Sequence, residues 1–581
     1  MSMLGTEPSA PLDQVTPAPD APAKRGRLFS SQSIGLTAAV LVVAYLALVP
    51  IIYLLDGVFI KDGSFTLEFF RKAYTADKLT SMLANSFVYA AGATVLAMII
   101  GTALAYLVAR TDVPMKGLVY TAALVPMIVP GVLHTIAWIF LASPQIGAIN
   151  KLLEPVLGPG FINIFSMKGM IFVEGIHNAP LVFLLMFAAF RNMDASLEES
   201  ALMCRARMST VFFRVTLPLV KPALALAALI MFIRVLSSFE VPALLGQSAG
   251  IWVFTSRIYY SLTGFPVDYG TAGAYAIGLL VILAVFTLWQ SRLNKRAKSY
   301  QTISGKGFRP TTVRLRGFRP VAGALVIVYF LVASLLPILI LLYTSLLGFY
   351  TAPSAAAFSH MNLHNYAELF QDSDTLTAMK NSLILAVGSA TIIMLLTSLI
   401  AWIVVRARAR GASVLSGLTM LPIAVPGLIL GVSLLFFYLR VPVPIYGTLW
   451  ILLIAYVTVF MPYGITYASS AMYQISGELE ESARACGAGY FMILRRVTLP
   501  LLMPGLIAGW TFIVLLAVRE LGASLLLYTP GRQVLSILIW QEWGDGKLVQ
   551  LAALGIVMIT FLIILVVVAR KLGAKVGVQA Q

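Results

Sequence analysis

Charged residues are scarce in this sequence, and their scarcity excludes most soluble proteins. Only 11% of the 581 residues are charged, whereas 59% are hydrophobic. A soluble domain carries charges on roughly a quarter of its residues. The composition therefore predicts an integral membrane protein.

Cysteine and histidine are also few, which argues against disulfide and metal chemistry. The two cysteines, Cys204 and Cys486, cannot form a secreted disulfide framework. We interpret them as small residues of the buried type that two copies of a repeat share. No histidine or further cysteine stands near either of them at ligand spacing. We therefore expect no metal site and no cofactor.

A phosphate-binding loop is missing as well. No Gly-x-x-x-x-Gly-Lys-Ser/Thr occurs, and the stretch from Ser304 to Gly307 is too short for one. We therefore expect a chain that is not itself an enzyme, so that any ATP hydrolysis takes place in a partner. The net charge is +17, but no basic domain with interleaved aromatic residues is present, so nucleic acid is not an expected partner.

Long apolar runs are what the sequence has instead. About 20 apolar residues suffice to cross a bilayer as a helix. Twelve runs meet this requirement, at residues 34–56, 86–109, 117–142, 169–190, 222–245, 271–291, 320–345, 382–405, 412–439, 448–472, 504–528 and 550–570. They predict an all-α membrane protein. Prolines 126, 130, 422 and 426 predict kinks in the third and ninth spans.

Basic residues cluster in alternate loops, which predicts the orientation of the chain. By the positive-inside rule these loops and both termini lie in the cytosol. The predicted organisation has five parts. They are a disordered cytosolic tail (1–30), a first transmembrane domain (31–291), a cytosolic linker (292–319), a second transmembrane domain (320–572) and a short cytosolic tail (573–581).

The two transmembrane domains are copies of each other. Asn85-Ser86 matches Asn381-Ser382, and Pro130-Gly131 matches Pro426-Gly427, both at a separation of 296 residues. The separation then falls to 282 residues, so the first copy carries 14 extra residues in the external loop after its third span. Six spans in each copy predict two parallel repeats related by an axis along the membrane normal.

A polar stretch interrupts the apolar runs once in each copy, between the fourth and fifth spans. It runs from Glu199 to Pro218 and again, 282 residues later, from Glu481 to Pro500. Acidic residues at its start suit the beginning of a helix. We expect the two prolines to end this helical segment, and Pro222 and Pro504 to begin the following span. The simpler alternative is an amphipathic helix on the membrane surface, which fits poorly with two copies of equal internal spacing.

Both stretches resemble the Glu-Ala-Ala loop of permease subunits in binding-protein-dependent ABC importers. The second copy carries the motif at Glu481, Ser482, Ala483, Gly487, Val497, Leu499 and Pro500. The first copy carries it at Glu199, Ser200, Ala201, Val215, Leu217 and Pro218. Arg205 stands where the family has glycine, so we expect the first loop to dock with altered geometry.

This resemblance implies a type I ABC importer permease fold and a set of partners. In that family the loop is a coupling helix that docks on an ATP-hydrolysing subunit, so two copies of an ABC ATPase are implied. A periplasmic solute-binding protein would deliver the solute at the other face. Alternating access would be driven by a rigid-body switch in a bacterial inner (plasma) membrane.

Ionisable residues inside the expected spans are candidates for the transport pathway, because they are expensive in lipid. Arg234 and Glu240 lie in the fifth span, and Arg519 and Glu520 in the eleventh, with the glutamates at matching positions. The alternative is an intramembrane ion pair that fixes helix packing. Glu174 and His177 share one face of the fourth span but not the repeat, and they fit structural partners better than metal ligands.

The fused double permease, with the segment from Arg519 to Trp540, most resembles the ferric-iron branch of the family. Thiamine, polyamine, sulfate and phosphonate permeases share this architecture, so iron rests on analogy. An ion-gradient-driven secondary transporter is the alternative from another class. Under it, the intramembrane carboxylates would be proton or sodium relays, and the two polar loops would have no reason to match.

Overall fold

The computed structural model describes residues 31–75, 79–193, 196–298, 314–407 and 411–575. Within these ranges the regular secondary structure is helical apart from one hairpin, β1 (Ile60–Lys61) with β2 (Ser64–Phe65). The expected tail at 1–30, residues 299–313 of the expected linker, and residues 576–581 lie outside the described residues. The ends of the linker are helical, because α12 (Tyr269–Lys298) continues into it and η5 (Arg316–Phe318) closes it.

Among the described residues, ten helices are long and apolar enough to cross a membrane. In the first repeat they are α1 (Ser31–Phe59), α3 (Leu79–Arg110), α7 (Met167–Arg191), η2 (Phe212–Thr216) with α10 (Leu217–Leu236), and α12. In the second they are α13 (Arg319–Phe330) with η6 (Leu331–Leu335) and α14 (Leu336–Ser345), α17 (Ser373–Trp402) with η7 (Ile403–Ala407), α20 (Leu449–Gln474), η9 (Leu494–Thr498) with α23 (Leu499–Val518), and α25 (Leu548–Lys575). The all-α fold is confirmed.

Two further helix pairs are sharply bent. The expected count of twelve spans is reached only if each bent pair is counted as one span. These pairs are α4 (Lys116–Leu124) and η1 (Val125–Met127) with α5 (Gly131–Ala142), and α18 (Ala412–Met420) and η8 (Leu421–Ala424) with α19 (Gly427–Arg440). The bends measure 102° and 106° and fall at Pro130 and Pro426. Proline cannot continue the backbone ladder, so the predicted kinks are confirmed and are sharper than a kink in one helix.

The predicted fifth and eleventh spans are wrong at both ends. Their helices begin at Phe212 and Arg495 and end at Leu236 and Val518, ahead of the predicted ends at 245 and 528. Pro218 and Pro500 do not end a helix, and Pro222 and Pro504 lie inside one. The wider π-helical turns η2 and η9 before Pro218 and Pro500 leave room for the proline rings.

After these early ends the chain turns back as a short helix in each repeat. In the first, η3 (Pro242–Gly246) and η4 (Gln247–Ala249) lead to α11 (Phe254–Thr263); in the second, η10 (Ser524–Leu526) leads to α24 (Leu535–Gly544). The hydroxyl of Thr255 donates to the carbonyl of Ser238 at 2.7 Å, and that of Ser536 donates to the carbonyl of Glu520 at 2.6 Å. These bonds satisfy backbone that has left the helical ladder.

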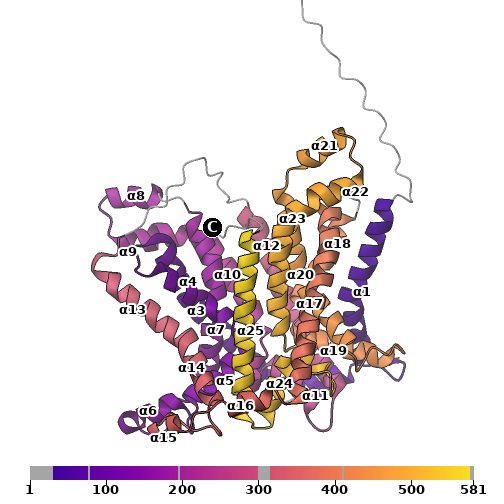
Figure 1. Ribbon diagram of the computed structural model, residues 1–581. Helices are drawn as coiled ribbons and strands as arrows, with labels where there is room; N and C mark the ends of the chain where they lie inside the picture. Colours follow the sequence, from indigo (N-terminus) through magenta and orange to yellow (C-terminus); the bar gives the residue numbers. More distant parts are fainter. Residues whose placement is uncertain (1–30, 76–78, 194–195, 299–313, 408–410, 576–581) are drawn as a thin grey trace, which may run out of the picture.

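The two repeats exchange their first spans. α1 packs along α18 and α19 of the second repeat, and α13 and α14 pack along α4 and α5 of the first (Figure 1). The Tyr45 and Tyr438 hydroxyls lie 2.9 Å apart across the α1–α19 contact. Residues 31–291 and 320–572 are therefore copies in sequence but interlocked in space.

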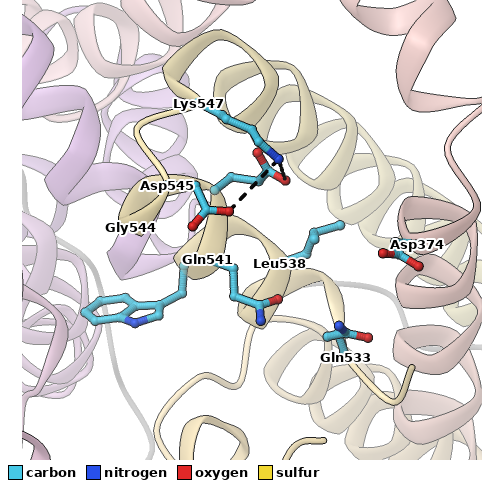
Figure 2. Close-up of a pocket in the computed structure, with 9 residues that line it drawn as sticks. Asp374, Gln533, Leu538, Gln541, Gly544, Asp545 and Lys547 are labelled. Atoms are coloured by element: carbon cyan, nitrogen blue, oxygen red, sulfur yellow. Dashed lines mark hydrogen bonds and ion pairs between the residues drawn. The ribbon is translucent and has the colours of Figure 1, made fainter. Parts of the chain in front are cut away.

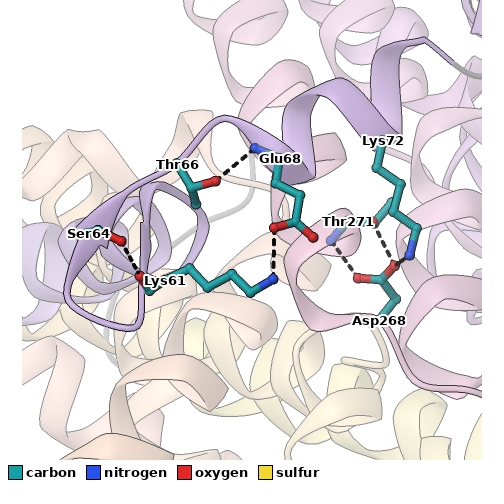
Figure 3. Close-up of polar contacts among 7 residues, drawn as sticks. All are labelled: Lys61, Ser64, Thr66, Glu68, Lys72, Asp268 and Thr271. Atoms are coloured by element: carbon teal, nitrogen blue, oxygen red, sulfur yellow. Dashed lines mark hydrogen bonds and ion pairs between the residues drawn. The ribbon is translucent and has the colours of Figure 1, made fainter.

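Polar contacts fix the loop between the first two spans against the start of α12 (Figure 3). Lys61 pairs with Glu68 at 2.7 Å, and Lys72 of α2 (Glu68–Tyr74) pairs with Asp268 at 2.5 Å. Asp268 also accepts from the backbone and hydroxyl of Thr271. Burial alone would raise the pKa of Asp268, but the bonds from Lys72 and Thr271 outweigh it and lower that pKa.

Three further short helices lie with this loop at one end of the bundle, the lower end in Figure 1. They are α6 (Ala148–Leu157), α15 (Ala355–Ser359) and α16 (His364–Leu369). α6 falls between the third and fourth spans of the first repeat, where the 14 extra residues were expected.

Candidate functional site: coupling helices and a central polar cluster

The repeated polar stretch forms a short helix in each half, as predicted. α8 (Ser196–Met203) is followed by α9 (Met208–Val211), and α21 (Gly477–Ala485) is followed by α22 (Tyr490–Ile493). Both α8 and α21 lie at the end of the bundle opposite α11 and α24 (Figure 1). A partner at that end could contact both helices at once.

A buried ionic triad holds α8 against the bundle. The Arg110 guanidinium at the end of α3 donates to Glu198 Oε2, and the Thr216 hydroxyl donates to Glu198 Oε1 at 2.5 Å. Arg110 is 2% exposed and Glu198 is 4% exposed. These three side chains therefore link α8 to the end of α3 and to η2, the turn that leads into α10.

The second half repeats the triad residue for residue. Arg406 Nε lies 3.4 Å from Glu480 Oε1, and the Thr498 hydroxyl donates to the same oxygen at 3.2 Å. Glu480 is 6% exposed. Arg484, on the surface of α21, adds a contact at 3.9 Å. Sequence reasoning missed these triads, although all three positions recur at the spacings of the repeat, 296 residues for the arginines and 282 for the others.

The predicted coupling residues form the outward face of the same helices. Glu199, Ser200, Glu481 and Ser482 are exposed, and Pro218 and Pro500 are exposed further along the chain. Ala201 and Ala483 are half-buried. Each helix thus has a buried glutamate that anchors it and, one residue later, an exposed glutamate on the surface.

Arg205 makes the turn that glycine makes in the other copy. Its φ is 59° and that of Gly487 is 79°, so both residues have the left-handed conformation. The turn is closed alike in both, by Ala206 N to Ala201 O at 3.2 Å and Ala488 N to Ala483 O at 3.0 Å. The backbone is therefore shared, and the difference between the copies is a side chain held at a steric cost.

The cysteine interpretation is wrong. Cys204 and Cys486 are both exposed free thiols, each next to the left-handed turn. Their recurrence reflects the shared loop, whose outer side they occupy, and not a packed interior.

Glu174 is the centre of a polar network within the membrane-spanning part. Its Oε2 accepts from the Tyr89 hydroxyl at 2.9 Å and from the Ser238 hydroxyl at 3.0 Å, and its Oε1 accepts from Asn178 at 2.8 Å. Arg234 Nε reaches Asn178 Oδ1 at 2.8 Å. The network joins α3, α7 and α10 of the first half.

Glu240 and Glu520 approach the two broken spans in the same way. A Cβ on Gly131 would lie 2.6 Å from Glu240 Oε2, and one on Gly427 would lie 2.9 Å from Glu520 Oε1. Each carboxylate therefore lies at the N-terminal end of α5 or α19, where a negative group is favoured. This contact explains the repeated Pro-Gly, because proline ends the first helix and glycine leaves room for the carboxylate.

The predicted arginines do not pair with their neighbouring glutamates. In the described ranges no ion pair within 4.0 Å involves Glu174, Glu240 or Glu520, so the ion-pair alternative has no support there. Arg519 instead donates to the carbonyl oxygen of Met127, at the break of the third span in the other half. His177 does not pair with Glu174, and its ring lies 4.9 Å from that of His134.

A polar pocket of about 510 Å³ lies at α24 (Figure 2), at the opposite end of the bundle from α8 and α21 (Figure 1). It is formed by α24, the residues after it and the start of α17, and its lining includes Asp374, Gln533, Gln541, Glu542 and Lys547. Lys547 lies 3.5 Å from Glu542, and burial raises the pKa of that carboxyl. Among the described residues, no group of three or more His, Cys, Asp or Glu could hold a metal ion.

Residues 93–299 and 393–577 each match the family described as "Binding-protein-dependent transport system inner membrane component". Together the two matches cover more than half of the chain. The chain belongs to this family. As a fused pair of these inner membrane components, it is a multi-pass protein of the inner membrane and part of a transport system.

Several relatives of this inner membrane component are iron permeases by name. The ferric transport system permease protein FbpB of Actinobacillus pleuropneumoniae is 28% identical over 72% of this chain, but the chain spans only 61% of that protein. The Fe(3+)-transport system permease protein FbpB 2 of Haemophilus influenzae is 23% identical over 86% of this chain and 91% of its own length. The 2-aminoethylphosphonate transport system permease protein PhnV of Salmonella typhimurium is 30% identical over 44% of this chain and 97% of its own length.

Proposed function

We propose that this inner membrane component is the complete permease of an ATP-driven importer that carries ferric iron. The observation that carries this proposal is the pair of helices α8 and α21, anchored by matching Arg–Glu–Thr triads at one end of the bundle. Two equal docking elements on one chain fit two copies of an ABC ATPase, and the chain needs no second membrane subunit.

The coupling step follows from how these helices are held. An ATPase that grips the exposed side of α8, at Glu199 and Ser200, moves Glu198 with it. The triad then moves the end of α3 and the start of α10 as one body, and Glu480 does the same for α17 and α23. Drawing the two helices together would in this way switch the membrane halves between two arrangements.

The orientation follows from the same assignment. The end that bears α8 and α21 faces the cytosol, with both termini, the linker and the ATPases. The opposite end, with α6, α11, α24 and the polar pocket, faces the periplasmic binding protein. Membrane lipid surrounds the spans between them.

The central ionisable residues line the path in this proposal. Glu240 and Glu520 stand at matching positions where the halves meet, and Arg234, Arg519, Glu174 and His177 surround them. Carboxylate oxygens suit a hard cation. The names of the FbpB relatives favour ferric iron over thiamine, polyamine, sulfate or phosphonate, although a 2-aminoethylphosphonate permease is also among the relatives.

The decisive experiment pairs Glu481→Arg with Glu478→Arg on the same helix α21. Both positions are exposed and lie one turn apart. Uptake of radioactive ferric iron would be measured in cells that also express the cognate ATPase and binding protein, and ATPase copurification with the permease would be scored. We expect Glu481→Arg to abolish both and Glu478→Arg to leave both largely intact.

Two results would overturn the proposal. Iron uptake that follows an ion gradient without any ATPase would assign the chain to secondary transport. Normal ATPase copurification and coupled uptake with Glu481→Arg would remove the coupling role of α21.

A further inference from the structure

An aromatic cluster joins the two halves at the end opposite the coupling helices. Tyr259 of α11 and Trp540 of α24 occupy matching positions of the two repeats, and their rings meet at 5.7 Å with an interplanar angle of 88°. Trp540 Nε1 donates to the Tyr259 hydroxyl at 3.2 Å. The ring of Phe239 lies 5.1 Å from Tyr259 and 5.3 Å from Trp540. We call these three residues the aromatic triad.

Each turned-back helix is tied to its own half by the repeated Asn-Ser pair. Asn85 donates to the carbonyl of Trp252 at 3.4 Å, and Phe254 N donates to the Ser86 hydroxyl at 3.2 Å. In the second half, Asn381 donates to the carbonyl of Gln533 at 2.9 Å, and Leu535 N donates to the Ser382 hydroxyl at 2.8 Å. α11 therefore moves with α3, and α24 moves with α17.

These ties place the triad under the control of the relative position of the halves. If the halves rotate as rigid bodies, Tyr259 and Trp540 are carried apart, because neither helix can stay behind. What is lost between them is edge-to-face ring contact and one hydrogen bond. Such contacts are weak enough to break in a transport cycle, at about 0.5–1.5 kcal/mol for each ring pair.

The triad is also next to the central carboxylates along the chain. Phe239 immediately precedes Glu240, and the turned-back helices bond the backbone of Ser238 and Glu520 through Thr255 and Ser536. The triad therefore adjoins Glu240 on the side of the bundle where α11 and α24 lie.

We propose that Phe239, Tyr259 and Trp540 form the gate on the α11–α24 side of the pathway, closed in this structure. The gate opens when the halves part and exposes Glu240 and Glu520 to that side. The assignment of this side as external rests on the proposed function. The gate itself requires only that the path runs between the halves.

The test uses chemical access to a reporter behind the gate. Ser238→Cys would be introduced into a Cys204→Ser, Cys486→Ser background and labelled with a membrane-impermeant maleimide in right-side-out vesicles. We expect slow labelling in this parent and about tenfold faster labelling after Trp540→Ala, the factor that corresponds to losing two ring contacts. Trp289→Ala, which removes a half-exposed tryptophan of α12, is the matched control and should change nothing.

A second variant keeps the proposal testable if Trp540→Ala does not fold. Tyr259→Ala removes the ring contacts with Phe239 and with Trp540 of the other half, and should speed labelling of the reporter by a similar factor. Unchanged labelling in Trp540→Ala or in Tyr259→Ala would overturn the gate. Neither measurement needs iron, binding protein or ATPase, so failure of the gate and failure of iron import are distinguishable. If only labelling from the cytosolic side responds, the gate stands and the proposed orientation fails.

Discussion

The two halves of this permease agree in some places to the residue and differ completely in others. The Arg–Glu–Thr triads, the Asn-Ser ties and the contacts of Gly131 and Gly427 with a glutamate all occur twice. Each of these contacts joins two segments of the same half. The proposed switch moves the two halves alike, which accounts for contacts that both halves share.

The polar network around Glu174 has no such copy. Tyr456 occupies the matching position and bonds the Ser524 hydroxyl at 2.8 Å, and Val459 matches His177. Phe239 of the aromatic triad matches Arg519, which reaches across to the Met127 carbonyl. In the proposed function these residues line a single path between the halves, so each half can contribute different residues to its lining.

Substitutions in the two Arg–Glu–Thr triads should produce the largest difference in stability between the halves. Arg110→Ala should destabilise the chain by about 3–5 kcal/mol, because it leaves the buried Glu198 carboxylate without its cation. Arg406→Ala should cost less, since the Arg406 side chain is 18% exposed and Arg484 also approaches Glu480. Thermal unfolding of the purified permease in detergent measures both, with the exposed Arg191→Ala as control. Equal losses would mean that burial does not separate the triads.

The next largest difference in stability is expected between substitutions of Tyr89 and Tyr456, whose contacts are not repeated in the other half. Tyr89→Phe removes a hydrogen bond to the Glu174 carboxyl, and Tyr456→Phe removes one between two hydroxyls. Bonds to carboxylates cost about 1.5–3 kcal/mol to lose and neutral ones about 1 kcal/mol, so Tyr89→Phe should lower stability more. The same unfolding measurement decides this, and a larger effect at Tyr456 would contradict it.

At the left-handed turn, one substitution in each loop should change the stability of that loop, in opposite directions. Arg205→Gly should stabilise the first coupling loop by about 1 kcal/mol, because glycine adopts this conformation freely. Gly487→Ala should destabilise the second loop by a similar amount. Hydrogen exchange of the α8 and α21 amides reports each loop separately. If both substitutions shift exchange in the same direction, side-chain contacts outweigh backbone strain there.

The smallest expected effect concerns acid pH and two carboxyl groups, those of Glu542 and Asp268, at the end of the bundle opposite the coupling helices. Burial raises the folded-state pKa of Glu542, so protonation favours the folded chain and Glu542 adds stability as the pH falls through that pKa. The pKa of Asp268 is lowered, so its contribution is present above its unfolded value and is lost below about pH 4. Melting curves of the wild-type chain should show a gain in stability at pH 5 relative to pH 7 from Glu542. Glu542→Gln should remove this gain, and Asp268→Asn should leave it in place.

Much of the fold follows from the sequence because hydropathy and repetition act over long stretches. Twenty apolar residues indicate a span wherever they occur, and Pro130 and Pro426 marked the two sharp bends. The early ends at Leu236 and Val518 could not be read in the same way. The residues that follow are still apolar, and the chain leaves the helix where hydroxyls far along the sequence, on Thr255 and Ser536, donate to its backbone carbonyls.

The site was predictable where a motif recurs and not where contacts are made in space. The exposed Glu199 and Glu481 were found, whereas their buried neighbours gained meaning only beside Arg110 and Arg406. His134 lies in a different span from His177, and no spacing predicts that their rings meet. The partner of Arg519 is a backbone carbonyl, which has no sequence signature at all.

The exchange of first spans dictates an order of assembly during synthesis. α1 enters the bilayer first, but α18 and α19, against which it packs, are made roughly 350 residues later. At about 5–20 residues per second, this helix waits on the order of 20–70 s in lipid with Tyr45 and Asp56 still lacking Tyr438 and Arg440. Fusion of the two repeats in one chain keeps the late partner within reach, so that the span waits for its own second half and not for another molecule.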